Sequence, residues 1–266
     1  MTLLVKGDGR GRDIVEVTPE SAGWQHVGFR AWRLTQGEQA SLSTGTRELC
    51  LVVLTGTVDV TVSDGKQQNF PGLGQRDSVF DDIPPAAVYV PPGHDVTLRA
   101  TRDAEVALCT APGRGYHDVR VLDPATMPRT VRGKGSNTRY VRDILPQTEP
   151  ADHLLVVEVV TPAGHASSYP PHKHDRDAAP EETQLEETYY HRLNPPQGFA
   201  FQRVYTDDRS LDESMAVENH DVVMVPRGYH PCVAPHGYDL YYLNVMAGPG
   251  RTWIFKNDPA HEWMLR

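Results

Sequence analysis

Two histidines separated by one residue constrain this chain more than any other feature. They lie in His172-Lys-His174, directly after the proline pair Pro170-Pro171. Side chains two residues apart point to the same face of an extended strand, so both imidazoles can reach one point, as a metal requires. On a helix the same two side chains would diverge. Because the proline pair disfavours helix entry, the pattern predicts a metal-binding strand.

The length and net charge of the chain limit the number of domains and the classes of binding partner. The 266 residues allow one large domain or two of about 130. The net charge of −9 argues against nucleic acid and anionic membranes as partners, since both attract clustered Lys and Arg. The three cysteines lie far apart without a C-x-x-C pair, and no apolar run is long enough for a signal peptide or a membrane span. We therefore expect a soluble, cytoplasmic protein.

Short Val-rich runs and frequent turn residues predict an all-β chain. The sequence has 22 Gly and 22 Pro, and helical periodicity is scarce. Strands are expected at 31–34, 48–62 with a bend at Gly56, 88–90, 96–100, 106–109, 153–160, 187–192, 199–205, 221–225, 232–234 and 238–246. The segment 113–137, rich in Gly, Pro and Arg, is interpreted as a connector.

The two halves of the chain resemble each other. The run 90–94, Val-Pro-Pro-Gly-His, matches the run 225–230, Val-Pro-Arg-Gly-Tyr-His, and 47–51 takes the place in the first half that 186–190 holds in the second. We infer a duplicated unit of antiparallel strands that closes into barrels, which removes exposed sheet edges. The predicted domains are residues 1–125 and 126–266.

The second half supplies further candidate ligands. A glutamate at the start of the next predicted strand and a histidine after Pro-x-Gly, His230, join the His-x-His pair. Two His, a Glu and a later His are the arrangement of cupins, small β-barrels with a metal at the mouth. Twelve residues separate His174 from Glu187, which is longer than the usual cupin spacing. Glu186 competes with Glu187, because neighbouring strand residues face opposite ways and only one can be a ligand.

The first half lacks the paired histidines. Ser43-Thr-Gly45 stands where His-x-His would be, so Glu48 and His94 cannot complete a four-ligand site. One metal is therefore expected, in the C-terminal barrel only.

Long runs in the second half resemble the 5-deoxy-glucuronate isomerases of myo-inositol catabolism. These runs are 172–175, 185–208, 225–231 and 244–251. The resemblance implies a bicupin, that is, two tandem RmlC-like jelly rolls. It also implies isomerisation of the aldose 5-deoxy-D-glucuronate to the ketose 5-dehydro-2-deoxy-D-gluconate. The related 5-keto-4-deoxyuronate isomerases bind zinc through two His, a Glu and a later His, which implies the ligands His172, His174, Glu187 and His230.

Isomerisation requires a base near the proton that moves, and the sequence does not single it out. From Glu187 onward the inward strand positions would be Tyr189 and His191, so these residues are catalytic candidates together with Glu187. In the last strand Tyr242 and Asn244 are polar residues expected to face inward, and they are candidates for substrate contact.

The implied substrate carries a carboxylate, which a planar guanidinium can bind through two hydrogen bonds. Arg203 and Arg251 are the candidates, and Gln202 would point away from the pocket if Arg203 points in. The acidic loop 175–182 is expected to be a solvated lid or insertion, since its carboxylates would repel an anionic substrate.

The expected cofactor is one divalent metal ion, with zinc ahead of manganese, iron and nickel, all of which suit these ligands. The expected partner is a small sugar acid, and a homo-oligomer is expected. Two rival hypotheses keep the bicupin fold: an Fe(II)-dependent dioxygenase, and a sugar-acid-binding protein without catalysis.

Overall fold

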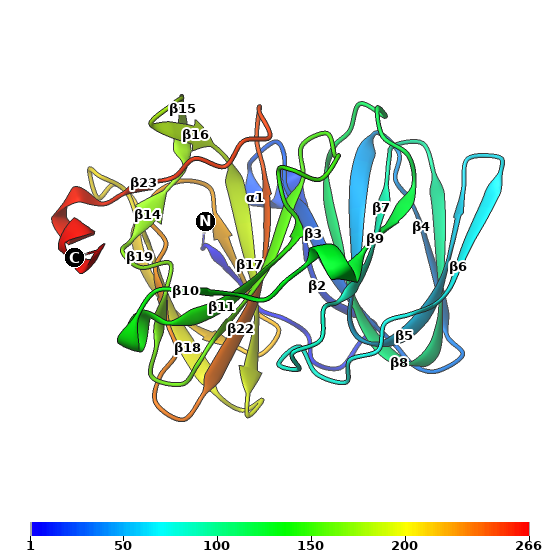
Figure 1. Cartoon of the computed structure of the whole chain (residues 1–266), viewed down its shortest axis with the longest axis horizontal. Coiled ribbons are helices and arrows are strands. Elements are labelled where there is room, and N and C mark those ends of the chain that lie inside the picture. Colours follow the sequence, from blue (N-terminus) through cyan, green and yellow to red (C-terminus); the bar gives the residue numbers. More distant parts are fainter. Residues whose placement is uncertain (1, 266) are drawn as a thin grey trace.

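The computed structural model describes residues 2–265 and is built almost entirely of strands. Two β-barrel lobes lie side by side, one formed by the blue to cyan part of the chain and the other mainly by the green to red part (Figure 1). The only α-helix in the described range is one turn, α1 (Pro19–Ala22), and no helix there is long and apolar enough to cross a membrane. The prediction of an all-β chain with two tandem cupin-type barrels is confirmed.

The N-terminal barrel is one eight-stranded sheet that curls around an apolar interior. Its strands are β2 (Asp13–Val17), β3 (Gly28–Leu34), β4 (Gln39–Ser43), β5 (Arg47–Ser63), β6 (Gln67–Leu73), β7 (Ala86–Val90), β8 (Asp95–Pro112) and β9 (Arg120–Leu122). The long strands β5 and β8 pair along most of their length, with register shifts around Gly56. Gly56 has φ +78°, and a Cβ there would lie 1.9 Å from the Asp103 carbonyl oxygen, which explains the predicted bend.

The C-terminal barrel combines a seven-stranded and a four-stranded sheet. The larger sheet has the order β1 (Leu4–Val5), β20 (Val222–Val225), β17 (Glu186–Asn194), β22 (Asp239–Ala247), β12 (Leu155–Thr161), β11 (Arg139–Leu145) and β10 (Thr130–Arg132). The smaller sheet has the order β13 (Ala166–Ser167), β21 (Cys232–Val233), β18 (Phe199–Tyr205) and β19 (Asp212–Glu218).

Short elements complete this lobe. They are the pair β14 (His172–Lys173) and β23 (Lys256–Asn257), the hairpin β15 (Asp175–Ala178) and β16 (Glu182–Gln184), and the 3-10 turns η1 (Pro124–Thr126), η2 (Gly135–Asn137) and η3 (Pro259–Leu265). The acidic loop is thus a two-stranded hairpin.

The N-terminal residues cross between the lobes. Leu4 and Val5 of β1 pair with Val223 and Val222 of β20, so β1 belongs to the C-terminal sheet although the predicted domain 1–125 includes it. The predicted boundary between 125 and 126 lies in η1, between the last strand of one barrel and the first of the other. The division itself stays a prediction.

The two barrels pack back to back through the outer faces of their sheets. One buried cluster joins Val52, Tyr89 and Cys109 of the first barrel to Tyr190 and Leu243 of the second. Cys50, Cys109 and Cys232 are free and buried, as is common for cysteines that pack as small apolar residues.

Two glutamates tie each barrel to a loop of the other. Glu48 accepts hydrogen bonds from the backbone N–H groups of residues 152, 153 and 154 at 2.8, 2.6 and 2.6 Å. Glu186 accepts from residues 25, 26 and 27 at 2.8, 2.7 and 3.0 Å. Glu48 is therefore the counterpart of Glu186, and the predicted alignment of 47–51 with 186–190 is off by one residue. The counterpart of Glu187 is Leu49, since these two residues lie opposite Val225 and Val90 respectively.

The interior of the N-terminal barrel is filled with apolar side chains. Leu49 and Val90 are fully buried there with Leu51, Val53 and Leu98, among others. The first barrel thus lacks both the His-x-His pair and a glutamate at the position of Leu49, and the described residues offer a metal cluster in the C-terminal barrel only.

A buried ion-pair network also joins the lobes. Arg76 of the first lobe donates to both carboxylate oxygens of Glu158 on β12, at 3.1 and 2.9 Å. Arg142 lies 3.2 Å from the same carboxylate, and the Tyr241 hydroxyl donates to it at 3.1 Å. The side chains of Arg76 and Glu158 are only 2% and 7% exposed, so neither charge can be solvated if its partner is removed.

We expect Glu158→Gln to lower the free energy of unfolding by about 3–5 kcal/mol, because it leaves the buried Arg76 guanidinium without a counter-charge, whereas Arg142 keeps its pair with Asp82 at 2.8 Å. Urea unfolding followed by fluorescence measures the change. The matched control is Asp212→Asn, which breaks the exposed pair with Arg203 and is expected to cost less than about 1 kcal/mol. Equal losses in the two variants would contradict the importance of burial.

A buried histidine near the interface between the barrels is expected to make the stability of the folded protein depend on pH. His220 Nδ1 is hydrogen-bonded to the Tyr190 hydroxyl, 2.7 Å away. Burial, followed by the Arg192 charge, lowers the pKa of His220 from 6.5 to about 4, although Glu105 acts in the opposite direction. The unfolded chain therefore binds a proton between pH 6.5 and 4 that the folded chain does not. Stability is expected to fall by about 2 kcal/mol over this window. Burial lowers the pKa of His191 to about 4 as well, so unfolding curves of His220→Gln should lose only the share of His220, whereas those of the exposed His236→Gln should keep it.

Candidate metal centre and its pocket

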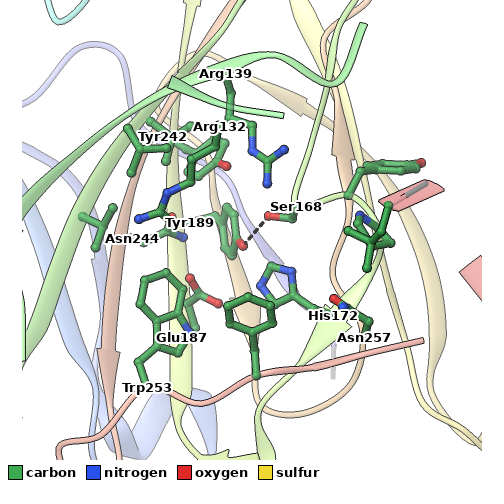
Figure 2. Close-up of a pocket in the computed structure, with 17 residues that line it drawn as sticks. Arg132, Arg139, Ser168, His172, Glu187, Tyr189, Tyr242, Asn244, Trp253 and Asn257 are labelled. Carbon is green, nitrogen blue, oxygen red and sulfur yellow. Dashed lines mark hydrogen bonds between the residues drawn. The ribbon is translucent and has the colours of Figure 1, made fainter. Parts of the chain in front are cut away.

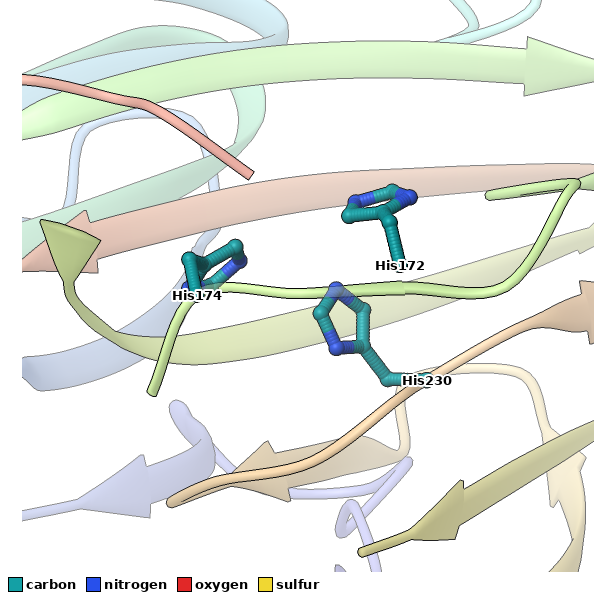
Figure 3. Close-up of side chains that lie close together, drawn as sticks. All are labelled: His172, His174 and His230. Carbon is teal, nitrogen blue, oxygen red and sulfur yellow. The ribbon is translucent and has the colours of Figure 1, made fainter. Parts of the chain in front are cut away.

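Three histidines meet at the mouth of the C-terminal barrel. His172 lies on β14, His174 follows it, and His230 comes after β20 (Figure 3). Their candidate ligand nitrogens all lie within 4.8 Å of one another. The pairing of β14 with β23 holds the His-x-His segment extended, as the spacing predicts.

Glu187 on β17 completes the group. Its Oε2 lies 3.1 Å from His174 Nε2 and 3.2 Å from His230 Nε2. Glu186, the alternative candidate, turns to the other barrel and binds backbone N–H groups there. The alternation of side chains along β17 separates the two carboxylates in this way.

The hydrogen bonds of the imidazoles prepare the site for a cation. His230 Nδ1 lies 2.8 Å from the Gly228 carbonyl oxygen, and His174 Nδ1 lies 3.1 Å from that of Leu185. Since a carbonyl only accepts, both Nδ1 atoms carry the proton, and both Nε2 lone pairs face the Glu187 carboxylate. Either a proton on Nε2 or a metal cation between these acceptors satisfies them, and, against the effect of burial, the hydrogen bond to Glu187 raises the pKa of His174. Such backbone partners of Nδ1 are typical of metal-ligating histidines.

The electrostatics of the group agree with this arrangement. Burial alone would raise the pKa of Glu187, but the neighbouring His230 and His174 lower it to about 2. Burial, together with the charges of His230 and His174, lowers the pKa of His172 well below 6.5. The carboxylate is therefore ionised and His172 is neutral near pH 7, which are the forms that bind a metal.

A pocket of about 280 Å³ opens beside this group. Glu187 and His172 lie at one end of it, and Arg139 lies at the other (Figure 2). Tyr189 and Asn244 line the wall between the two ends.

Three predicted pocket residues do line this cavity. The Tyr189 hydroxyl bonds Ser168 Oγ at 3.1 Å, and the Tyr242 hydroxyl bonds Ser167 Oγ at 2.5 Å. Asn244 is 5% exposed, and its Nδ2 has no hydrogen-bond partner among the described residues. A buried amide donor without a protein partner in a pocket wall is suited to a ligand oxygen.

Two of the predicted residues lie elsewhere. His191 is fully buried beneath the pocket, where its Nε2 lies 2.9 Å from Gln202 Oε1. Arg203 is exposed on β18 and pairs with Asp212 through two hydrogen bonds of 2.7 Å. The predicted orientation of β18 is wrong: Gln202 points inward and Arg203 outward, because residues 200, 202 and 204 face the core.

Arg251 also lies away from the pocket. Its guanidinium donates to the backbone carbonyls of Pro146 and Leu154 at 2.6 and 2.7 Å, and to those of Gln147 and Glu149. Four carbonyl partners leave no face of the guanidinium for a substrate carboxylate, so Arg251 acts as a clip between loops.

The arginines that line the pocket are Arg132 and Arg139, which lie opposite each other on β10 and β11. Arg139 is half-buried and forms no salt bridge within residues 2–265, although it donates at 3.1 Å to Asn137. Over the same described range, Arg132 has only a distant carboxylate, Asp143, at 3.7 Å. Sequence reasoning missed this pair because the Gly- and Pro-rich segment 113–137 hid β10, although Arg139 and Val141 already had strand alternation.

Comparison with known proteins agrees with this geometry. The sequence matches the KduI/IolB family over residues 3–264. It is 52% identical to the 5-deoxy-glucuronate isomerase of Geobacillus thermodenitrificans, over 95% of this chain and 91% of that protein. It is 48% identical to the enzyme of the same name from Bacillus subtilis strain 168, over 94% and 92%.

Solved structures extend the likeness. An IolB-like protein from Salmonella typhimurium LT2 superposes with a TM-score of 0.97 at 50% identity, over all of both chains. Bacillus subtilis oxalate decarboxylase superposes with a TM-score of 0.64 at 13% identity, over 96% of this chain and 78% of that one, which shows a shared fold alone. The family resemblance inferred from the sequence is confirmed.

Proposed function

Because the chain belongs to the KduI/IolB family, we propose that it is an aldose–ketose isomerase that converts 5-deoxy-D-glucuronate to 5-dehydro-2-deoxy-D-gluconate. The observation that carries the proposal is the pocket itself. A candidate cation site lies at one end, and at the other lie arginines that have no close carboxylate partner among the described residues, which suits a molecule with a reacting carbonyl at C1 and a carboxylate at C6.

A divalent metal would be held by His172, His174, His230 and Glu187. The donor set of three imidazole nitrogens and one carboxylate fits zinc, manganese, iron or nickel, with zinc as our first expectation. When bound, the metal supplies Lewis-acid stabilisation of the negative charge that develops on the substrate oxygens.

The protein side chains bind and orient the substrate. Arg139 and Arg132 bind its carboxylate, because a planar guanidinium can donate two parallel hydrogen bonds to a carboxylate. Asn244 donates its free N–H to a hydroxyl or carbonyl oxygen, and the Tyr189 hydroxyl lies on the same wall. Tyr242 completes that wall.

In the reaction a hydrogen leaves C2 and arrives at C1, while the oxygen at C1 gains a proton and that at C2 loses one. Tyr189, whose hydroxyl is hydrogen-bonded to Ser168, is our candidate for the group that transfers the proton at these oxygens. His191 acts indirectly. Its hydrogen bond holds Gln202, and Gln202 donates to the His230 carbonyl at 3.3 Å, so His191 is a positioning residue for His230.

Proton NMR of purified, metal-replete protein with 5-deoxy-D-glucuronate tests the function, with loss of the aldose signals and growth of the ketose signals as the expected result. Elemental analysis of the same sample identifies the metal. No turnover by metal-replete protein would refute the isomerase assignment. Oxygen consumption without isomerisation would favour an Fe(II) oxygenase, and substrate binding without either would favour a binding protein.

Two further expectations stay predictions. A homo-oligomer is expected, and light scattering of the purified protein measures its mass. A cytoplasmic location is expected, and fractionation of the producing cells tests it.

A further inference from the structure

Between the arginines and the metal end, part of the pocket wall is purely apolar. Val141 of β11 and Val159 of β12 line the pocket and lie directly opposite each other in the sheet. Val157, two residues before Val159, lines it as well and lies opposite Asn244. These side chains are almost completely buried and offer no hydrogen-bonding atom.

The position of Val141 relative to Arg139 is fixed by the strand. The two residues are separated by one position on β11, so their side chains leave the same face about 7 Å apart. A carboxylate bound by Arg139, in a substrate that extends toward the metal end, would place its next carbon along the wall that Val141 and Val159 form.

The chemistry of the substrate gives this placement a meaning, and the argument here rests on the proposed function. In 5-deoxy-D-glucuronate the carbon next to the carboxylate, C5, is a methylene, whereas C2, C3 and C4 each carry a hydroxyl. The only apolar carbon of the chain would thus meet the apolar part of the wall.

We propose that Val141 and Val159 are specificity-determining residues that select a substrate without a hydroxyl at C5. D-Glucuronate, which has that hydroxyl, would bury it against two side chains that cannot bond it. An apolar pocket rejects an added hydroxyl by roughly 10- to 100-fold, because the hydroxyl loses its water without gaining a partner.

The neighbouring polar groups are already bonded or do not line the pocket. The Tyr242 hydroxyl, on the strand beside Val159, is bonded to Ser167 at 2.5 Å. Thr161, the next residue of β12 on the same face, is fully buried and does not line the pocket.

The test is a change of substrate preference in Val159→Thr and Val141→Thr. Threonine has nearly the shape of valine and adds one hydroxyl that can bond the C5 hydroxyl. We expect kcat/KM for D-glucuronate, relative to that for 5-deoxy-D-glucuronate, to rise at least about tenfold over the wild-type ratio. D-Glucuronate closes into a six-membered hemiacetal that the 5-deoxy acid cannot form. This property of the substrates cancels when variant and wild-type ratios are compared.

The matched control is Val160→Thr, on the same strand but facing the other way, which should leave the ratio unchanged. Thermal unfolding verifies that each variant is folded. An unchanged ratio in folded variants at both positions would overturn the proposal. So would a wild-type enzyme that uses the open-chain form of D-glucuronate, quantified by NMR, as efficiently as its deoxy substrate, and this comparison decides the matter if neither variant folds. A wild type inactive on both acids would instead refute the proposed function.

Discussion

Replacing His230 with alanine is expected to lower kcat by at least about 10³-fold and to release the metal from the protein. His230 supplies one of three imidazole nitrogens that lie within 4.8 Å of one another, it lies 3.2 Å from Glu187, and its Nδ1 is already fixed by the Gly228 carbonyl. Lewis-acid stabilisation is worth several kcal/mol of the activation barrier, and each 1.36 kcal/mol is a factor of ten in rate. Elemental analysis after gel filtration and the NMR assay measure the two losses.

The duplicated fold provides a matched control for this variant. His94 follows the corresponding Pro-x-Gly of the first barrel, and its Nδ1 lies 3.0 Å from the Pro92 carbonyl oxygen, much as His230 bonds Gly228. Leu49 stands in that barrel where Glu187 stands in this one. His94→Ala should therefore keep its metal and its rate. Equal losses in both variants would mean that the effect comes from the loop and not from metal ligation.

Replacing Arg139 with glutamine is expected to lower kcat/KM by roughly 10- to 100-fold, mainly through KM. A hydrogen bond to a charged group is worth about 1.5–3 kcal/mol, and the Arg139 guanidinium has no carboxylate partner in the described part of the chain. Initial rates over a range of substrate concentrations separate KM from kcat. Arg139→Lys keeps the charge without the planar fork and should recover part of the loss.

The control for Arg139 is Arg203, which was the candidate from sequence alone. Arg203→Gln removes an exposed guanidinium paired with Asp212 and should leave kcat/KM unchanged. A large effect of Arg203→Gln, together with none of Arg139→Gln, would contradict the placement of the substrate carboxylate. The binding site for the substrate carboxylate would then lie near β18.

The four candidate arginines show that the type of a residue is a weak predictor of its role. Arg132, Arg139, Arg203 and Arg251 all lie in or beside strands, and each has the chemistry to bind a carboxylate. Their partners decide the role: backbone carbonyls occupy Arg251, and Asp212 occupies Arg203. These partners are 9 to 105 residues away in the chain, a separation that no local pattern encodes.

The local features of this protein can be predicted from its sequence alone. His172 and His174 share a face because strand geometry has a period of two, and the two Pro-x-Gly runs revealed the duplicated barrel. An all-β fold and a single metal-binding barrel followed from these local rules, and the family resemblance followed from the long runs around them.

Only the tertiary structure decided which way Glu186 and Glu187 face and which arginines reach the pocket. Alternation requires that the two glutamates face opposite ways, but the choice depends on the loop 25–27, whose N–H groups take the carboxylate of Glu186. A local period fixes the relative orientation of neighbours. Packing against distant segments fixes the absolute one, because the free energy of burying a polar group depends on the partner that it finds.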